Sequence, residues 1–130
     1  MKVFERDGKI NFVDEQNRFV GFDARQQCCE SFGWFVSSNL PGATTKVDLG
    51  KNQSKAILED YVFDPESAPI SGVIPRKGGE DAATHFVAFR LVSKMGQRNP
   101  LYLCLVNSHN GYYTHGIKTK GLRGDKAMRI

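Results

Sequence analysis

Two long apolar segments in the last third of the chain constrain its fold more than any other feature. Thr84–Val92 and Leu101–Asn107 carry apolar residues at both alternating sets of positions. Strands with this pattern are covered on both faces, which is typical of the centre of a packed sheet. The connection Ser93–Pro100 is polar and short enough for a hairpin loop. The sequence therefore predicts a central antiparallel pair of strands, 84–92 and 101–108.

Three shorter β-prone segments occupy the N-terminal part of the chain. Val3–Arg6 and Lys9–Val13 are separated by Asp7-Gly8, a pair that favours a two-residue hairpin turn. Arg18–Phe22 follows after a polar turn and is again β-prone and aromatic. These segments predict a meander of antiparallel strands.

A short helix is predicted at 24–31. Asp23 has the chemistry of an N-cap, and Gln26 three residues later completes a capping box. We expect Trp34 to pack in the core near this helix, because it follows the helix by only a few residues. The expected fold class is α+β, with a mainly antiparallel sheet and one or two short helices.

The middle of the chain is less regular. Ile57–Phe63 fits a helical face and a strand core equally well. Asp64–Glu80 is rich in proline and glycine, which predicts a long surface loop.

Length and composition indicate one globular domain. The chain has 130 residues, of which 40% are hydrophobic and 25% charged, as in ordinary folded proteins. We expect a single domain over residues 1–117 and a basic C-terminal tail over 118–130. No apolar segment approaches the roughly 20 residues that span a bilayer, and residues 1–12 lack the pattern of a signal peptide. The expected location is therefore the cytoplasm, with no membrane partner.

A second hairpin is predicted around Asn110-Gly111, the preferred pair for a type I′ turn. Pairing across that turn aligns Asn107 with Thr114 and His109 with Tyr112. Because side chains alternate across a sheet, one face then carries a polar group that we take as a candidate binding site: Asn107, His109, Tyr112 and Thr114. The other face carries Cys104 and His115, so the two histidines point in opposite directions.

The adjacent cysteines Cys28 and Cys29 have two interpretations. Either thiol could form a nucleophile pair with His109 or His115, which makes these four residues candidate catalytic groups. The alternative is buried packing, which is common for cysteine. Adjacent cysteines lack the C-x₂-C spacing of zinc sites, and no nucleotide-binding or metalloprotease motif is present. We therefore expect no metal and no cofactor.

The segment 118–130 carries five basic residues and one acidic residue, which accounts for the whole net charge of +4. A basic arm can neutralise phosphates and so bind nucleic acid, whereas many such termini are simply solvated. The candidate residues are Lys118, Lys120, Arg123, Lys126 and Arg129.

Two motifs together carry a family resemblance. The first is Cys28-Cys29-Glu30 followed by the aromatic residues Phe32 and Trp34, and the second is the segment 107–113, Asn-Ser-His-Asn-Gly-Tyr-Tyr. In this combination the chain resembles an uncharacterised family of small phage and bacterial proteins, which pairs a double cysteine and an aromatic residue with a Ser-Asn-Gly-Tyr-Tyr turn. Here His109 stands between the serine and the asparagine. The resemblance implies no particular activity.

Three functional hypotheses follow. The first is a non-enzymatic binding or accessory protein of phage or mobile-element type, with a protein partner or a second copy of the chain. The second is a small Cys–His thiol enzyme or hydrolase. The third is a nucleic-acid-associated protein that acts through its basic tail.

Overall fold

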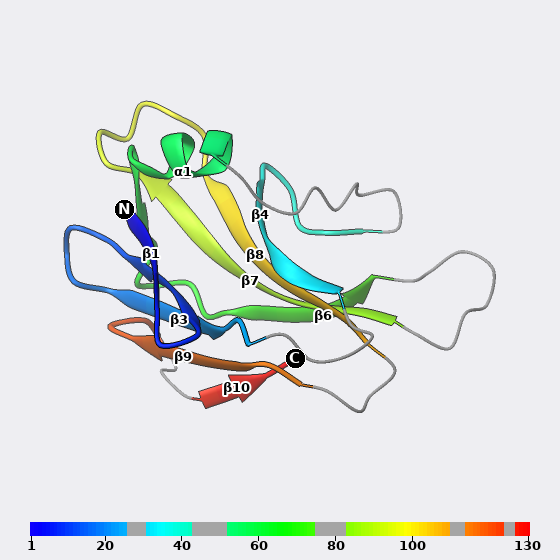
Figure 1. Cartoon of the computed structure of the whole chain (residues 1–130). Helices are drawn as coiled ribbons and strands as arrows, with labels where there is room; N and C mark the ends of the chain where they lie inside the picture. Colours follow the sequence, from blue (N-terminus) through cyan, green and yellow to red (C-terminus); the bar gives the residue numbers. More distant parts are fainter. Residues whose placement is uncertain (26–30, 43–51, 75–82, 110–113, 124–126) are drawn as a thin grey trace.

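The structure is a computed structural model that describes residues 1–25, 31–42, 52–74, 83–109, 114–123 and 127–130. Two antiparallel sheets lie face to face (Figure 1). The first sheet contains, in spatial order, β1 (Lys2–Arg6), β2 (Lys9–Val13), β3 (Phe19–Asp23), β9 (Gly116–Lys120) and β10 (Ala127–Arg129). The second contains β4 (Ser31–Ser37), β8 (Leu101–His109), β7 (Ala83–Ser93) and β5 (Tyr61–Phe63), and β6 (Ile70–Ile74) also pairs with β7.

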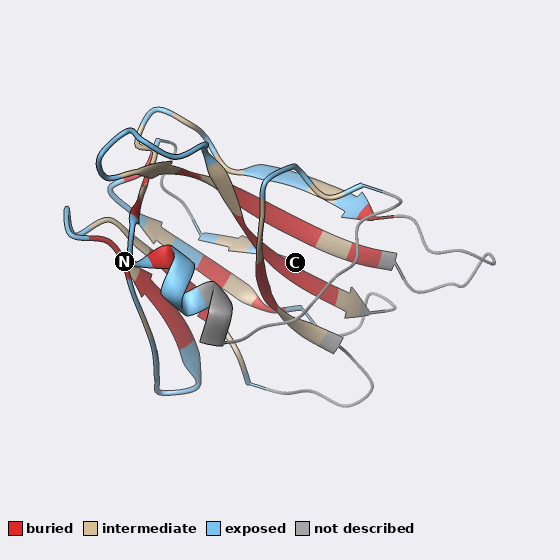
Figure 2. Cartoon of the chain, turned by 90° about the horizontal axis from the view of Figure 1, so that it is seen from above, coloured by how far each residue is buried: buried red, intermediate tan, exposed pale blue. Residues whose placement is uncertain are grey.

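The core lies between the two sheets. Phe12, Val20 and Phe22 of the first sheet pack in one apolar cluster with residues such as Trp34, Leu103 and Leu105 of the second. Figure 2 shows buried positions along the strands of both sheets, while turns and much of the helix surface are exposed. A second apolar cluster covers the opposite face of the second sheet, around Phe35, Phe86 and Cys104. The middle of the second sheet is thus apolar on both sides, as its sequence pattern predicts.

Three sequence predictions are confirmed. The segments predicted as central strands form β7 and β8, which pair with each other from Ala83 opposite His109 to Leu91 opposite Leu101. Asp7 and Gly8 connect β1 and β2 with φ angles of 53° and 74°, as a type I′ turn requires. The Trp34 side chain is buried in the core, as predicted, and its ring meets that of Phe12 edge-on at a centroid distance of 5.2 Å. The helix expected beside it falls mostly on residues that the structure does not describe.

The expected α+β class is wrong, because most of the regular structure in the described residues is antiparallel strand and almost none is helix, which makes the protein all-β. Its one described helix is the short α1 (Asn52–Leu58). The predicted helix at 24–31 lies mostly outside the described residues, and its described ends are not helical, since Ala24 and Arg25 follow β3 and Ser31 begins β4. Asp23 itself ends β3, and its carboxylate accepts a hydrogen bond from the Arg25 amide at 3.1 Å. The cap-forming chemistry of Asp23 therefore serves a tight turn at the end of β3.

The middle of the chain resolves into separate elements. The ambiguous segment 57–63 divides, because α1 ends at Leu58 and β5 begins at Tyr61. The predicted loop 64–80 is partly wrong, since β6 lies within it and pairs antiparallel with β7. This strand fits between Pro69 and Pro75 in the sequence, where proline favours strand ends and edges.

The first sheet extends beyond residue 117, where the sequence analysis ended the domain. Ile117 and the residues up to Lys120 belong to β9, and β10 pairs with β9. The backbone of Ile130 exchanges two hydrogen bonds with that of His115, at 2.8 and 3.1 Å. Leu122 and Ile130 are buried in the core, so apolar packing holds the C-terminal segment against the sheet.

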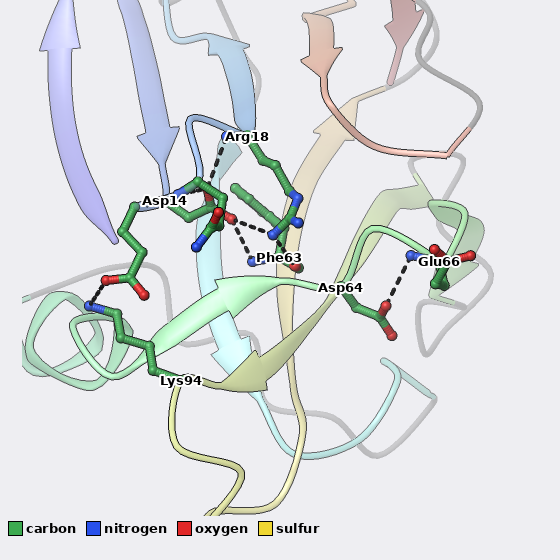
Figure 3. Close-up of polar contacts among 8 residues, drawn as sticks. Asp14, Arg18, Phe63, Asp64, Glu66 and Lys94 are labelled. Atoms are coloured by element: carbon green, nitrogen blue, oxygen red, sulfur yellow. Dashed lines mark hydrogen bonds and ion pairs between the residues drawn. The ribbon is translucent and has the colours of Figure 1, made fainter.

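A buried carboxylate connects the two sheets where the turn after β2 meets β5 (Figure 3). Asp14, in the turn after β2, accepts hydrogen bonds from the amides of Gln16 and Arg18, both at 2.9 Å. Its other oxygen accepts the Phe63 amide at 3.0 Å and lies 3.5 Å from the Arg18 guanidinium. The Asp14 carboxylate is thus fully engaged in holding a turn of the first sheet to β5 of the second.

Candidate functional site

The two described members of the predicted polar group, Asn107 and Thr114, do not pair across a β8–β9 hairpin. Asn107 of β8 aligns with Phe32 and His85 in the second sheet, and its Nδ2 donates to the Ile130 carbonyl at 3.0 Å. Thr114 is exposed on the segment that leads to the first sheet. The expected pairing of Asn107 with Thr114 is wrong, because the chain changes sheets between β8 and β9. Tyr112 and the Asn110-Gly111 turn lie outside the described residues, as does the side chain of His109, which ends β8.

His115 is a core residue. Its side chain is 1% exposed, its ring lies against Phe32 at a centroid distance of 4.2 Å, and Nδ1 lies 2.6 Å from the Asp23 carbonyl oxygen. The expected common face of His115 and Cys104 is wrong, because Cys104 belongs to the apolar cluster on the far side of the second sheet. Burial raises the pKa of the Cys104 thiol to about 12.

The candidate catalytic set is therefore not brought together by the part of the chain that is described. Cys28 and Cys29 lie outside it, and His115 has no access to solvent. Among the described residues there is also no cluster of three or more histidine, cysteine, aspartate or glutamate side chains that could hold a metal ion. Within the described ranges, no helix is long and apolar enough to cross a membrane.

The basic C-terminal residues have different surroundings. Lys118 and Lys120 of β9 and Arg129 of β10 are exposed, and they occupy strand positions that alternate with the core residues Ile117 and Met128. Alternation places them on the outer face of the first sheet. Arg123 lies beyond β9 and reaches the Glu66 carbonyl at 3.5 Å. Lys126 lies outside the described residues.

The outer face of the first sheet, which we call the basic face, gathers cations from the opposite ends of the chain. Lys2, Arg6 and Lys9 of β1 and β2 share it with the three basic residues of β9 and β10, because β3 pairs with both β2 and β9. Asp23 is the one acidic residue among the outward positions of these five strands. The outward positions, strand by strand, are Lys2, Phe4, Arg6, Lys9, Asn11, Val13, Phe19, Gly21, Asp23, Gly116, Lys118, Lys120, Ala127 and Arg129.

The charge of Asp23 is compensated locally. Its Oδ2 lies 2.7 Å from the Arg25 guanidinium, and this hydrogen bond lowers the pKa of Asp23 to about 2. Arg6 has a weaker ion pair, at 3.9 Å, with the exposed Asp7. Within the described ranges, Lys9, Lys118 and Arg129 form no ion pair with a carboxylate. The basic face therefore keeps a net positive charge available to an anionic partner.

A shallow groove of about 410 Å³ crosses the basic face between β2 and β10. Its floor includes the small residues Gly21, Gly116 and Ala127, and Phe19 lines one part of it. The charged residues around the groove are Lys9, Asp23, Arg25, Lys118 and Arg129. A second groove, of about 520 Å³, lies beyond the β1 edge and shares Lys2 and Phe4 with the face. Basic residues thus continue from β10 across the first sheet to the second groove, where Lys2 of β1 and Lys55 of α1 lie.

Sequence analysis found the C-terminal half of this face and missed the N-terminal half. Lys2, Phe4 and Arg6 alternate along β1, and Lys9 and Asn11 alternate along β2. This period is visible in the sequence, but it does not reveal that β9 joins the same sheet. Comparison with protein-family models, curated proteins and solved structures finds no match to this chain.

Proposed function

We propose that this chain is a non-enzymatic accessory protein that binds nucleic acid through the basic face. The observation that carries the proposal is the segregation of charge on that face, where six basic residues and one compensated carboxylate occupy the outward positions of one sheet. Phosphate contacts by lysine and arginine supply most of the affinity of sequence-independent nucleic-acid binding.

The arrangement of the charges supports a polyanionic chain as the ligand. Neighbouring strands lie roughly 4.8 Å apart, and alternate residues along one strand roughly 7 Å apart. Lys118 and Lys120 are alternate residues of β9, and Lys9 lies across β3 from that strand. A sheet with cations in this two-dimensional array can contact several phosphates of one ligand at once. The sheet, rather than a separate tail, carries the contacts.

Two acidic residues lie near the edge of the basic face, Glu5 on β1 and Asp7 in the β1–β2 turn beside Arg6, and several others lie farther away. Asp14 and Glu15 lie in the turn after β2, and Asp60 and Asp64 flank β5. Repulsion of a polyanion from these regions favours one orientation of binding, with the first sheet toward the ligand.

The test is binding of a short fluorescent oligonucleotide, measured by anisotropy over a range of salt concentrations. We expect wild-type affinity to fall steeply with salt, and the double variant Lys9→Glu, Lys118→Glu to bind much more weakly. Its slope of log affinity against log salt should be smaller by about one for each phosphate that the variant no longer neutralises.

Arg98→Glu is the matched control. Arg98 is exposed in the loop between β7 and β8, and Figure 1 shows that loop at the end of the second sheet, away from β9 and β10. We expect this variant to bind almost as the wild type does. Salt-independent binding by the wild type, or an equal loss of affinity per reversed charge in both variants, overturns the proposal.

A further inference from the structure

We infer that the groove on the basic face holds one unstacked nucleobase against Phe19, so that the protein prefers single strands to duplexes. This inference rests on the proposed function and specifies the form of its ligand. It is based on the shape of the groove, the position of one aromatic ring and the placement of charge around that ring.

The groove exists because two outward positions lack side chains. A Cβ added at Gly116 would meet no atom within 4 Å, so the space above this residue is open. At Gly21, on the neighbouring strand, a Cβ would lie 2.6 Å from the Cζ of Phe19. The Phe19 ring therefore extends over Gly21 and forms a wall beside the open space over Gly116. The groove volume of about 410 Å³ lies in the range of sites for small organic groups.

An aromatic wall beside a cationic rim suits a nucleotide in particular. Base stacking on aromatic side chains recurs in proteins that bind single strands, because every base has a π-face. Lys9, Lys118 and Arg129 line the same groove and can hold the flanking phosphates. Asp23 would repel a phosphate, but its partner Arg25 compensates its charge, and a neutral base can lie beside the pair.

A second aromatic ring extends this arrangement along the sheet. Phe4 of β1 is 43% exposed and aligns with Asn11, which in turn aligns with Gly21 beneath the Phe19 ring. Bases within a duplex are already stacked and paired, so they cannot reach either ring without being extruded. A duplex would therefore contact only the lysine and arginine side chains, whereas a single strand gains the stacking contacts as well.

The experiment compares three ligands of equal length at one salt concentration: a single-stranded oligonucleotide, the duplex that contains it, and an abasic strand with the same phosphates. We expect the single strand to bind roughly tenfold more tightly than the abasic strand, as one or two stacked bases imply, and more tightly than the duplex. Gly116→Leu should fill the groove without a clash in the sheet and remove most of the preference for the single strand over the abasic strand.

Two further measurements make the result specific to the groove. Gly42→Leu is the matched control, because a Cβ at Gly42 also meets open space but lies outside the first sheet; it should bind as the wild type does. Abasic-strand affinity and its salt dependence should be the same for Gly116→Leu and the wild type. Equal affinity for all three ligands, or an unchanged single-strand preference in Gly116→Leu, overturns the inference and leaves the proposed function standing. Absence of salt-dependent binding to all three ligands in the wild type overturns both.

Discussion

The carboxylate of Asp14 accepts a hydrogen bond from the backbone amide of Phe63 at 3.0 Å, across 49 positions of sequence and between the two sheets. The same side chain satisfies two further amides in its own turn and pairs with Arg18. Arg18 in turn donates to the Phe63 carbonyl at 3.3 Å, so both backbone groups of this β5 residue are bound by the first sheet. One buried acid therefore fixes how the sheets meet at this end.

Removal of this carboxylate should be costly. Asp14→Ala leaves the buried Phe63 amide and the partly buried amides of Gln16 and Arg18 without their acceptor, and a fully buried unsatisfied donor costs about 1–3 kcal/mol. We expect the free energy of unfolding to fall by about 3 kcal/mol or more, measured by urea denaturation. Glu15→Ala is the neighbouring control, since its exposed ion pair with Lys94, at 3.4 Å, is worth less than about 1 kcal/mol. Similar losses of stability in the two variants would show that the carboxylate of Asp14 does not hold the sheets together.

Trp34 should be one of the most sensitive core positions. Its ring is 7% exposed and contacts Phe12 across the interface between the sheets. Trp34→Ala removes the largest side chain in the core and should lower the free energy of unfolding by about 3–5 kcal/mol. Met95→Ala, at a position 76% exposed in a loop, should change it by less than about 0.5 kcal/mol. A small effect at Trp34 would contradict the packing of the two sheets.

Thiol labelling separates Cys104 from the adjacent cysteines. Because burial raises the pKa of Cys104 to about 12, its reactive thiolate form is scarce at neutral pH. We expect the double variant Cys28→Ser, Cys29→Ser to react with a thiol reagent only after unfolding. Labelling of the native Cys104→Ala variant then reports directly on the adjacent pair. Rapid reaction of the native double variant would mean that Cys104 is accessible.

The pair of Asp23 and Arg25 predicts a pH dependence of stability. Because its folded-state pKa of about 2 lies below the roughly 3.9 of an unperturbed aspartate, ionised Asp23 stabilises the folded state. This contribution is present above about pH 4 and is lost as the pH falls toward 2. Arg25→Ala should raise the pKa of Asp23, and its stability deficit relative to the wild type should shrink over this range. Titration of the Asp23 carboxyl signal by NMR measures the shift, and an unchanged pKa in Arg25→Ala would rule out the pair as its cause.

Local patterns predicted several elements correctly. The φ angles at Asp7 and Gly8 follow from turn chemistry, and the strands β7 and β8 follow from an apolar pattern that only a doubly covered strand needs. The helix expected after Asp23 shows the limit of the same approach. An aspartate can cap a helix or bond a nearby backbone amide outside a helix with the same local chemistry, and here its carboxylate bonds the amide of Arg25, which is not helical.

The candidate site was only half predictable for a related reason. The sequence identified Lys118, Lys120 and Arg129 as basic residues but did not assign them to a sheet. The hairpin signal at Asn110-Gly111 predicted that β8 pairs with the strand that follows it. Instead, β9 pairs with β3, which brings it beside residues more than 90 positions earlier in the chain. The sequence therefore predicted which residues alternate along a strand, but it did not predict which strands pair with each other.

The sequence by itself determined the N-terminal strands, the two central strands that need both faces covered, and where the hairpin between β1 and β2 turns, but not β6 or β10. These properties depend on residues close together in the chain. Only the tertiary structure decided that the chain changes sheets before β9, that His115 enters the core, and that lysines from both ends of the chain share one face. Those outcomes depend on how the apolar faces of all the strands are buried together, and burial between distant segments leaves no local pattern in the sequence.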